Sequence, residues 1–338
     1  MNILVTGGAG YLGAILCTQL LESGHKVTCL DRLFFGSQPL QNVSNKIKIL
    51  KDDIRWFSPT ILKEIDAVLD LASICNDPKN ELDPKKTLEV NYHGRVRVAT
   101  LAKKHGVKKY VLASSCSVYG YQEGLLNEKS PLKPQTTYAK ASALAEKKII
   151  PLANKHFSPT ILRPTTLYGP SPKMRFDLTI HKMVLSLIRT GKIPLLHDGK
   201  QWHPYVHIKD TTNAFKTIIK SDPELVSGQI FNVGDNSQNI QIFKLAQTIA
   251  KAINLPFKYE WYGSNDNRSY KVDFNKIKKT LNYKIKHTIK DGAKEVYNAI
   301  QNQTINADDP RTIPVKWYKK LLQSPSLRKE LEINNILL

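Results

Sequence analysis

The sequence predicts an α/β fold, a doubly wound parallel sheet with a smaller C-terminal lobe. Three observations predict it. An apolar run opens into a glycine turn near the start, strand and helix patterns alternate over the first two thirds, and the pattern loosens after residue 165. With 338 residues, 41% of them hydrophobic and 23% charged, the chain is long enough for one or two domains.

The first element is a strand over residues 2–6, which runs into Gly7, Gly10 and Gly13 with the spacing G-x-x-G-x-x-G. A helix pattern follows over residues 11–24. The first two glycines let the backbone turn tightly and approach a pyrophosphate, and the third lets the helix lie close to the strand. The helix N-terminus adds partial positive charge. The turn therefore predicts a dinucleotide site.

The second strand, residues 26–31, ends at Asp31, 18 residues after Gly13. A carboxylate at about this distance holds the ribose 2′-OH of a dinucleotide, which favours NAD. Arg32 leaves NADP open, because an arginine near this site can accommodate a 2′-phosphate.

The remaining elements of the first domain are short apolar runs of the buried-strand type and two long helices. Asp83-Pro84 opens one helix with a capping acid and a proline in the first turn. The strands are expected at 47–51, 67–72, 109–114 and 159–163, and the helices at 84–105 and 137–154. We therefore expect residues 1–165 to form the dinucleotide-binding domain.

After residue 165 the chain passes through the turn cluster Gly169-Pro170-Ser171-Pro172. Helices are expected at 178–190, 208–220, 240–253 and 287–303, and short strands near 193–196 and 229–233. Residues 166–303 read as a substrate-binding lobe that is partly interleaved with the first domain. Residues 304–338 form a C-terminal extension with little strong periodicity.

Composition narrows the functional classes. No apolar run reaches the roughly 18 residues that a membrane span needs, and no membrane partner is expected. The start of the chain reads as a core strand, not as a cleavable signal. The cysteines form no C-x-x-C pair. We expect a reduced, cytoplasmic protein.

The formal net charge of +21 raises the possibility of a nucleic-acid partner. The basic residues are mostly lysines scattered along the chain, however, and no aromatic stacking residues alternate with them. We interpret them as solvated faces, whose field would also attract a diphosphate. No nucleic-acid partner and no metal site are expected.

Two hydroxyl side chains are the candidate catalytic groups. Ser115 follows the strand at 109–114, and in an open α/β sheet ligands lie at the carboxyl ends of strands. Tyr138 comes 23 residues later, at the start of a helix. A phenol beside a serine hydroxyl can remove or return a proton on a sugar hydroxyl while a hydride moves to nicotinamide.

Taken in order, these motifs resemble the extended short-chain dehydrogenases/reductases of the NAD-dependent epimerase/dehydratase family, which have a Rossmann fold and act on nucleotide sugars. The resemblance covers about residues 1–303. The matching segments are Thr6-Gly7-Gly8-Ala9-Gly10-Tyr11-Leu12-Gly13, Asp31, Asp53-Ile54-Arg55, Leu71-Ala72, Asn91-Tyr92-His93-Gly94, the segment around Ser115, Tyr138, Arg163-Pro164-Thr165-Thr166-Leu167-Tyr168-Gly169-Pro170 and Arg268-Ser269-Tyr270.

The resemblance implies a role for each matching position. Asp53 and Ile54 would flank the adenine, Ala72 would lie against the cofactor, and Pro164 would line the nicotinamide. The implied cofactor-binding residues are Gly7, Gly10, Tyr11, Leu12, Gly13, Asp31, Arg32, Asp53, Ile54, Leu71, Ala72, Asn91, Tyr138 and Pro164. The implied substrate-binding residues are Ser115, Thr166, Arg175, His203 and Arg268, with Arg268 on the diphosphate.

One departure bears on catalysis. The family pattern is Y-x-x-x-K, and its lysine lowers the pKa of the tyrosine and holds the nicotinamide ribose. Here Ser142 stands at that position, and Lys140, Lys147 and Lys148 are out of reach around or along the helix. In one reading, another cation or a water bridged by Ser142 replaces the lysine, and Ser142 joins Ser115 and Tyr138 as a catalytic candidate. In the other reading, the chain binds the cofactor with little catalysis.

Dehydratases of the family carry an acid just after the catalytic serine or threonine, and here Cys116 and Ser117 follow. We therefore expect an NAD-dependent nucleotide-sugar epimerase that transiently oxidises a hydroxyl, most simply at C4. The alternatives are a nucleotide-sugar dehydrogenase or ketoreductase and a catalytically weak binding protein. The resemblance also implies a homodimer formed through the helices at 84–105 and 137–154.

Overall fold

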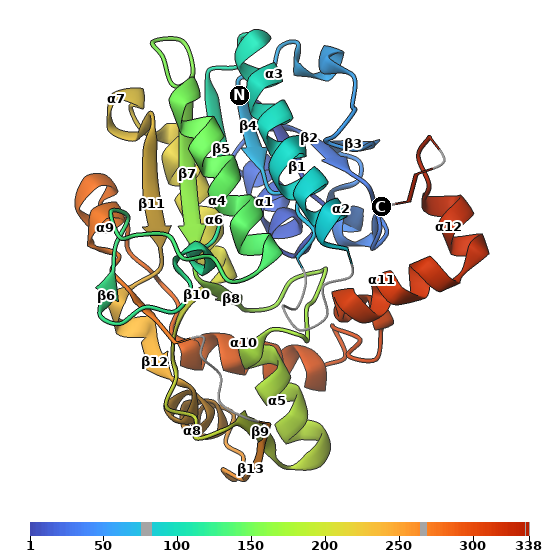
Figure 1. The fold of residues 1–338 in the computed structure, drawn as a ribbon. Coiled ribbons are helices and arrows are strands. Elements are labelled where there is room, and N and C mark those ends of the chain that lie inside the picture. The colour runs from blue at the N-terminus through green and yellow to red at the C-terminus, as the bar shows by residue number, and fades with distance from the viewer. Residues whose placement is uncertain (76–82, 264–268, 335, 338) are drawn as a thin grey trace.

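The computed structural model describes residues 1–75, 83–263, 269–334 and 336–337. The described chain forms an upper lobe around a large parallel sheet and a smaller lower lobe (Figure 1). No helix among the described residues combines the length and the apolar character that a membrane crossing needs.

The large sheet has seven parallel strands in the order β11-β7-β5-β4-β1-β2-β3, as the alternation of strands and helices predicts. Its strands are β1 (Asn2–Thr6), β2 (Lys26–Asp31), β3 (Ile47–Lys51), β4 (Ala67–Asp70), β5 (Lys109–Ala113), β7 (Ser158–Pro164) and β11 (Gln229–Val233). The chain order reverses between β1 and β4, where Ile3 pairs with Ala67. This reversal is the point at which open sheets of this kind bind ligands.

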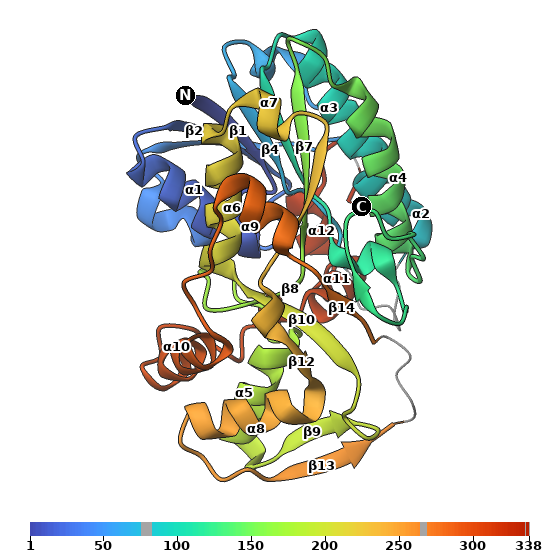
Figure 2. The same cartoon turned by 90° about the vertical axis from the view of Figure 1, so that its left-hand side faces the viewer.

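Helices cover both faces of the sheet (Figure 2). α1 (Tyr11–Glu22) and α6 (Ile208–Lys220) lie on one face, and α3 (Arg95–Lys104) and α4 (Thr137–Ile149) lie on the other. Because successive strand residues point to opposite faces, Val5 packs in the α1/α6 core and Leu4 in the α3/α4 core. The sheet is therefore buried on both sides.

The helix predicted at 84–105 has a π-helical segment in its middle. It consists of α2 (Pro84–Leu88), the π-helical η4 (Glu89–Gly94) and α3, and Asp83 caps its start through the Lys86 amide, 3.0 Å away. Such π segments commonly occur at functional sites. Here the segment carries Asn91 and is followed directly by Arg95.

The lower lobe has its own apolar core, formed largely by one face each of α5, α8 and α10. Its helices are α5 (Thr179–Thr190), α8 (Ile242–Ala252) and α10 (Ile289–Gln301), and its strands are β8 (Thr166–Tyr168), β9 (Ile193–Leu196), β10 (Trp202–His207), β12 (Asn239–Gln241) and β13 (Tyr259–Tyr262). α6 and β11 leave this stretch of sequence to join the upper lobe, so the two lobes are interleaved. Smaller elements complete the fold: β6 (Leu125–Leu126), α7 (Pro223–Val226), β14 (Lys271–Val272) and α9 (Asn275–Leu281).

The C-terminal segment, which we define as the described residues of 314–337 (314–334 and 336–337), is more ordered than its weak periodicity indicates. It forms α11 (Pro314–Gln323) and α12 (Pro325–Leu331), drawn in red in Figure 1. The Trp317 indole donates to the carbonyl of Phe34 at 2.6 Å. Arg32 donates to the carbonyls of Leu331 and Leu337 at 3.2 and 2.7 Å. These contacts join positions some 300 residues apart, which is why local periodicity does not reveal them.

A buried ion pair fixes α4 to the large sheet. Arg163 and Glu146 are 2% and 3% exposed, and their closest N–O distance is 2.5 Å. Arg163 also donates to the Tyr119 hydroxyl at 2.8 Å, and Ser114 donates to Glu146. The pair thus connects the helix that carries Tyr138 with the segment that carries Ser115.

We expect Arg163→Leu to lower the free energy of unfolding by about 3–5 kcal/mol, because it leaves the Glu146 carboxylate buried and unpaired. Urea denaturation of the cofactor-free protein measures the loss. The double variant Glu146→Leu/Arg163→Leu, which removes both charges, recovers most of it. A loss below about 1 kcal/mol in the single variant would contradict this role of the pair.

Candidate active site

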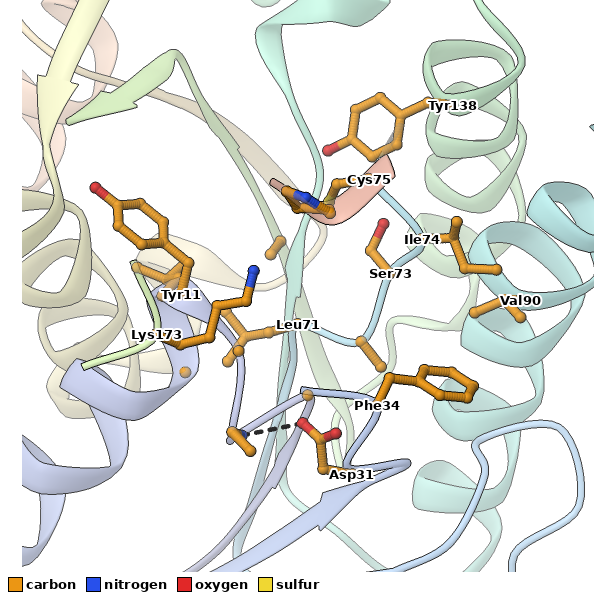
Figure 3. A pocket seen from close by; sticks show the side chains of 18 of the residues that line it. Tyr11, Asp31, Phe34, Leu71, Ser73, Ile74, Cys75, Val90, Tyr138 and Lys173 are labelled. Carbon is orange, nitrogen blue, oxygen red and sulfur yellow. Dashed lines mark hydrogen bonds between the residues drawn. The ribbon is translucent and has the colours of Figure 1, made fainter. Parts of the chain in front are cut away.

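The candidate site is a cavity of about 380 Å³ at the carboxyl ends of β1 and β4, where the strand order reverses. The glycine turn, the segment after β4, the start of α4 and the loop after β8 form its walls, and the C-terminal segment adds Pro314 and Tyr318. Figure 3 shows the Tyr138 phenol and the Lys173 amine entering this space from different walls.

The glycine turn leaves no room for side chains. A Cβ at Gly13 would lie 2.3 Å from the Gly7 carbonyl oxygen, and a Cβ at Gly7 would lie 2.8 Å from the Ala72 Cα. Gly7 also has a φ of +68°, which favours glycine. The turn therefore presents bare backbone at the start of α1, as a bound pyrophosphate requires. Tyr11 and Leu12 line the same wall.

Asp31 lies at the end of β2 and lines the cavity. Its carboxylate accepts from the amide of Ala9 at 3.0 Å, the dashed bond of Figure 3, and from the amide of Leu33 at 2.7 Å. Burial raises the pKa of Asp31, and these two amides lower it. Asp31 therefore ties the glycine turn to the segment that follows β2.

Arg32 lines the cavity and also holds the C-terminal segment. One of its nitrogens donates to three carbonyls of that segment, and Nη1 lies 3.6 Å from Asp53. Its Nε and Nη1 are buried and form no hydrogen bond within the described residues. The Asp31 carboxylate on the same cavity favours NAD.

Other predicted cofactor residues, Asp53, Ile54, Leu71, Ala72 and Pro164, line the cavity as well. β4 ends at Asp70, two residues before the predicted end, and the amide of Ala72 donates to the Thr6 hydroxyl at 3.2 Å. Asn91 does not line the cavity. Its buried amide group pairs with both the N–H and the C=O of Ile74, at 2.8 and 2.9 Å. Asn91 therefore positions the segment after β4.

The structure brings Ser115 and Tyr138 together. Ser115 accepts from the Ser117 amide at 3.1 Å, and Thr136 caps α4 so that Tyr138 lies in its first turn. The pKa of Tyr138 is raised to about 12, mainly by burial and secondly by the nearby Cys75. Arg95 and a hydrogen bond with Ser115 act in the opposite direction and lower it. At neutral pH the phenol therefore holds its proton.

Ser142 does not take the place of the missing lysine. Its side chain is fully buried, and its hydroxyl donates to the Tyr138 carbonyl at 3.0 Å. It is absent from the cavity wall, so the expectation that it belongs with the catalytic groups needs correction. A serine four residues along a helix commonly bonds the preceding turn in this way.

Five polar side chains of the cavity wall have atoms that are buried and lack a hydrogen-bond partner among the described residues. They are Arg32, Ser73, Arg95, Ser117 and Thr165. Buried polar groups are normally paired. Their presence at one cavity, beside a bare glycine turn, fits a bound polar ligand, and the donor set suits a dinucleotide.

Lys173 was not among the residues predicted from the sequence. It is 6% exposed, and its amine lies 3.8 Å from the centre of the Phe35 ring. The pKa of Lys173 is lowered to about 7, mainly by burial and secondly by the positive charge of Arg175. Two hydrogen bonds hold its loop: Tyr11 donates to the Gly169 carbonyl at 2.7 Å, and the Gly169 amide donates to His181 at 2.9 Å. The only sequence signal was a lysine next to a Pro-rich turn.

The predicted substrate residues are not all at the cavity. Thr166 and Arg175 line it, and Arg175 also pairs with Asp177 at 2.5 Å. His203 is absent from the wall and packs edge-on against Tyr270, with ring centres 5.8 Å apart. Arg268 lies outside the described residues. In the described part of the chain, no three His, Cys, Asp or Glu side chains group as metal ligands.

Comparison with known proteins gives a consistent result. The model of the NAD dependent epimerase/dehydratase family matches residues 3–234. The uncharacterized UDP-glucose epimerase YtcB of Bacillus subtilis is 27% identical over 86% of this chain and 95% of its own. The UDP-glucose 4-epimerase of Lactobacillus helveticus is 26% identical over 94% of this chain and 97% of its own.

A solved structure with the same fold is the UDP-glucuronic acid 4-epimerase from Bacillus cereus, in complex with UDP-glucuronic acid and NAD. Its TM-score is 0.81 at 23% identity, over 90% of this chain and 100% of that one.

The lowered pKa of Lys173 predicts proton uptake when an anion enters the cavity. At pH 8 the free amine is largely neutral, and the negative charge of a dinucleotide in the same cavity would raise its pKa, so we expect binding of NAD to be accompanied by proton uptake. Below about pH 6 the amine is already charged, and the uptake disappears. Calorimetry in two buffers of different ionisation enthalpy measures it, and Lys173→Met abolishes it. Equal uptake in wild type and Lys173→Met would overturn the assignment.

Proposed function

Because the chain belongs to the NAD dependent epimerase/dehydratase family, we propose that it is a nucleotide-sugar epimerase that inverts a sugar carbon, at C4. NAD is the cofactor. When bound, its nicotinamide takes a hydride from the sugar carbon and returns it to the other face. Turnover then leaves the cofactor unchanged.

The observation that carries this proposal is the Ser115–Tyr138 pair on a wall without carboxylates. The acidic side chains that line the described cavity are Asp31, Asp52 and Asp53, which belong to the ends of β2 and β3. Cys116, which follows Ser115, is fully buried and directs its thiol to the Arg163 carbonyl at 3.1 Å. Elimination of water needs a positioned acid and base beyond the phenol. Epimerisation needs only the phenol and the serine.

Each residue then has a defined task. Ser115 donates to or accepts from the sugar hydroxyl and holds it next to the phenol. In its phenolate form, reached once bound cofactor and the cavity's cations lower its pKa, Tyr138 would take the hydroxyl proton as the carbon is oxidised and give it back as the carbon is reduced. Thr166 and Arg175 lie on the same cavity and are proposed to hold the substrate, with Arg175 donating to phosphate or sugar oxygens.

The C-terminal segment favours an epimerase over a dehydrogenase. Tyr318 is 4% exposed and packs in a core with Ile74 and Leu321, directly against the cavity. Arg32 holds the end of this segment by three hydrogen bonds. An enzyme of net oxidation must release its reduced cofactor in every cycle. An epimerase retains its cofactor between cycles, so a C-terminal segment that covers the cavity does not slow its turnover. We call this segment the cover.

We further propose a homodimer that forms through the outer faces of α3 and α4, in the cytoplasm. α4 presents Leu144, which is 41% exposed, and both helices lie side by side on one face of the upper lobe (Figure 2). The division into a cofactor domain (1–165), a substrate lobe (166–303) and a C-terminal extension remains part of this proposal.

The direct test is conversion of UDP-glucose, UDP-N-acetylglucosamine and UDP-glucuronic acid by the purified protein, followed by NMR of the products. We expect the 4-epimer of one of them, with NAD released on denaturation. Tyr138→Phe lowers the rate by about 10²–10⁴, because it removes the proton carrier.

Ser115→Ala lowers the rate as well, while Tyr121→Phe, an exposed tyrosine, serves as the matched control. Loss of the carboxyl carbon from UDP-glucuronic acid would instead identify a decarboxylase. Net accumulation of NADH would identify a dehydrogenase. No conversion of any sugar would identify a cofactor-binding protein.

A second prediction concerns the cover. A variant that ends after Ile313 lacks α11 and α12 and exchanges bound NAD for added radiolabelled NAD at least about tenfold faster, since opening a cavity removes several buried contacts. Gel filtration of samples withdrawn over time measures the exchange. Arg32→Met, which releases the end of the segment, has a smaller effect in the same direction. Unchanged exchange in both variants would remove this argument for retention.

A further inference from the structure

Arg95 is a deeply buried cation of the cavity wall. It lies at the first position of α3, is 1% exposed and lines the cavity beside the segment after β4. Its Nε donates to the Ala72 carbonyl at 3.0 Å. Its Nη1 is buried and has no hydrogen-bond partner within the described chain. A charged group in this state is costly unless a ligand completes its bonding.

Arg95 stabilises the charge of buried Asp70, because it lowers the pKa of that carboxyl against the effect of burial, but this leaves its Nη1 without a hydrogen bond. The nearby Asp70 is fully buried, and its two oxygens accept from the hydroxyls of Thr6 and Tyr110. Arg95 forms no salt bridge with any carboxylate in the described ranges. Asp70 therefore needs no direct contact with Arg95 for its hydrogen bonding, and Nη1 remains available to the cavity.

The surroundings of Tyr138 provide the second observation. Position 142, one turn along α4, carries only a serine that bonds backbone. Among the described residues, Cys75, Arg95 and Arg175 are the ionisable groups with the largest effect on the Tyr138 phenol, and Arg95 is the strongest of those that stabilise its charged form. Lys173, another buried cation of the cavity, interacts with Arg175, Asp177, Cys75 and Asp31.

We propose that Arg95 supplies, from α3, the positive charge that α4 does not provide, and that its unpartnered Nη1 donates to an oxygen of the bound dinucleotide. This inference rests on the proposed function. Arg95 thus binds cofactor and acts on the reaction through Tyr138. With the charge in place, the phenol can lose and regain its proton without a lysine on its own helix.

The experiment compares wild type, Arg95→Met, Arg95→Lys and the double variant Arg95→Met/Ser142→Lys. Equilibrium dialysis measures the affinity for NAD without sugar. Arg95→Met weakens it about tenfold or more, as expected for one hydrogen bond to a charged donor. Arg95→Lys, which keeps the charge, retains most of the affinity. The double variant, which returns a cation to α4, regains at least part of it.

The rate of sugar conversion is then measured against pH. Wild-type activity rises as Tyr138 loses its proton, and in Arg95→Met the rise moves up by about one pH unit, which is about a tenfold lower rate at a given pH. Ser142→Lys in that background moves it back. Lys104→Met, at an exposed lysine of the same helix, removes one charge and leaves both readouts unchanged.

The proposal is overturned if Arg95→Met changes only the melting temperature and leaves NAD affinity and pH profile as in wild type. It is also overturned if the double variant Arg95→Met/Ser142→Lys recovers neither the NAD affinity nor the pH profile of the wild type. Arg95→Gln keeps a donor for the Ala72 carbonyl without the charge, so it decides the question if Arg95→Met does not fold. If wild type converts no sugar, the proposed function fails, and the dialysis still decides whether Arg95 binds the dinucleotide.

Discussion

The site depends on how closely the glycine turn approaches the segment after β4. Gly7 is so near Ala72 that a side chain at position 7 would collide with its backbone. Three other groups hold the same segment: the Thr6 hydroxyl, the Asn91 amide and the Arg95 guanidinium. Because these groups come from β1, η4 and α3, one short stretch of backbone sets the positions of both the cofactor wall and the catalytic wall. The π-helical turn at η4 is the local distortion that brings Asn91 to it.

The upper lobe was largely predictable, because its signals are local. The glycine spacing, the apolar runs and the acid at position 31 each reflect contacts within one βαβ unit, and β1, β2, β3 and β11 begin and end at the predicted residues. Ser115 and Tyr138 were also predictable, since strand ends and helix starts determine which groups meet at a sheet edge.

The remaining features arise from contacts between distant segments. Arg95 belongs to no periodic pattern or motif, although it directly follows the recognised Asn91-Tyr92-His93-Gly94 segment. The available clue was an arginine at the buried start of a helix. Lys173 depends on a loop fixed by Tyr11 and His181. Arg32 forms its hydrogen bonds with the distant C-terminal segment, and Ser142 bonds a backbone carbonyl of its own helix. Neither partner follows from the residue type.

The cover formed by residues 314–337 has a consequence for synthesis of the protein. A ribosome makes the glycine turn, β2 and Arg32 long before it makes Trp317, Tyr318 and Leu331. A nascent chain can therefore form the floor of the cavity while the top stays open, and cofactor captured early is held less firmly than cofactor in the finished molecule.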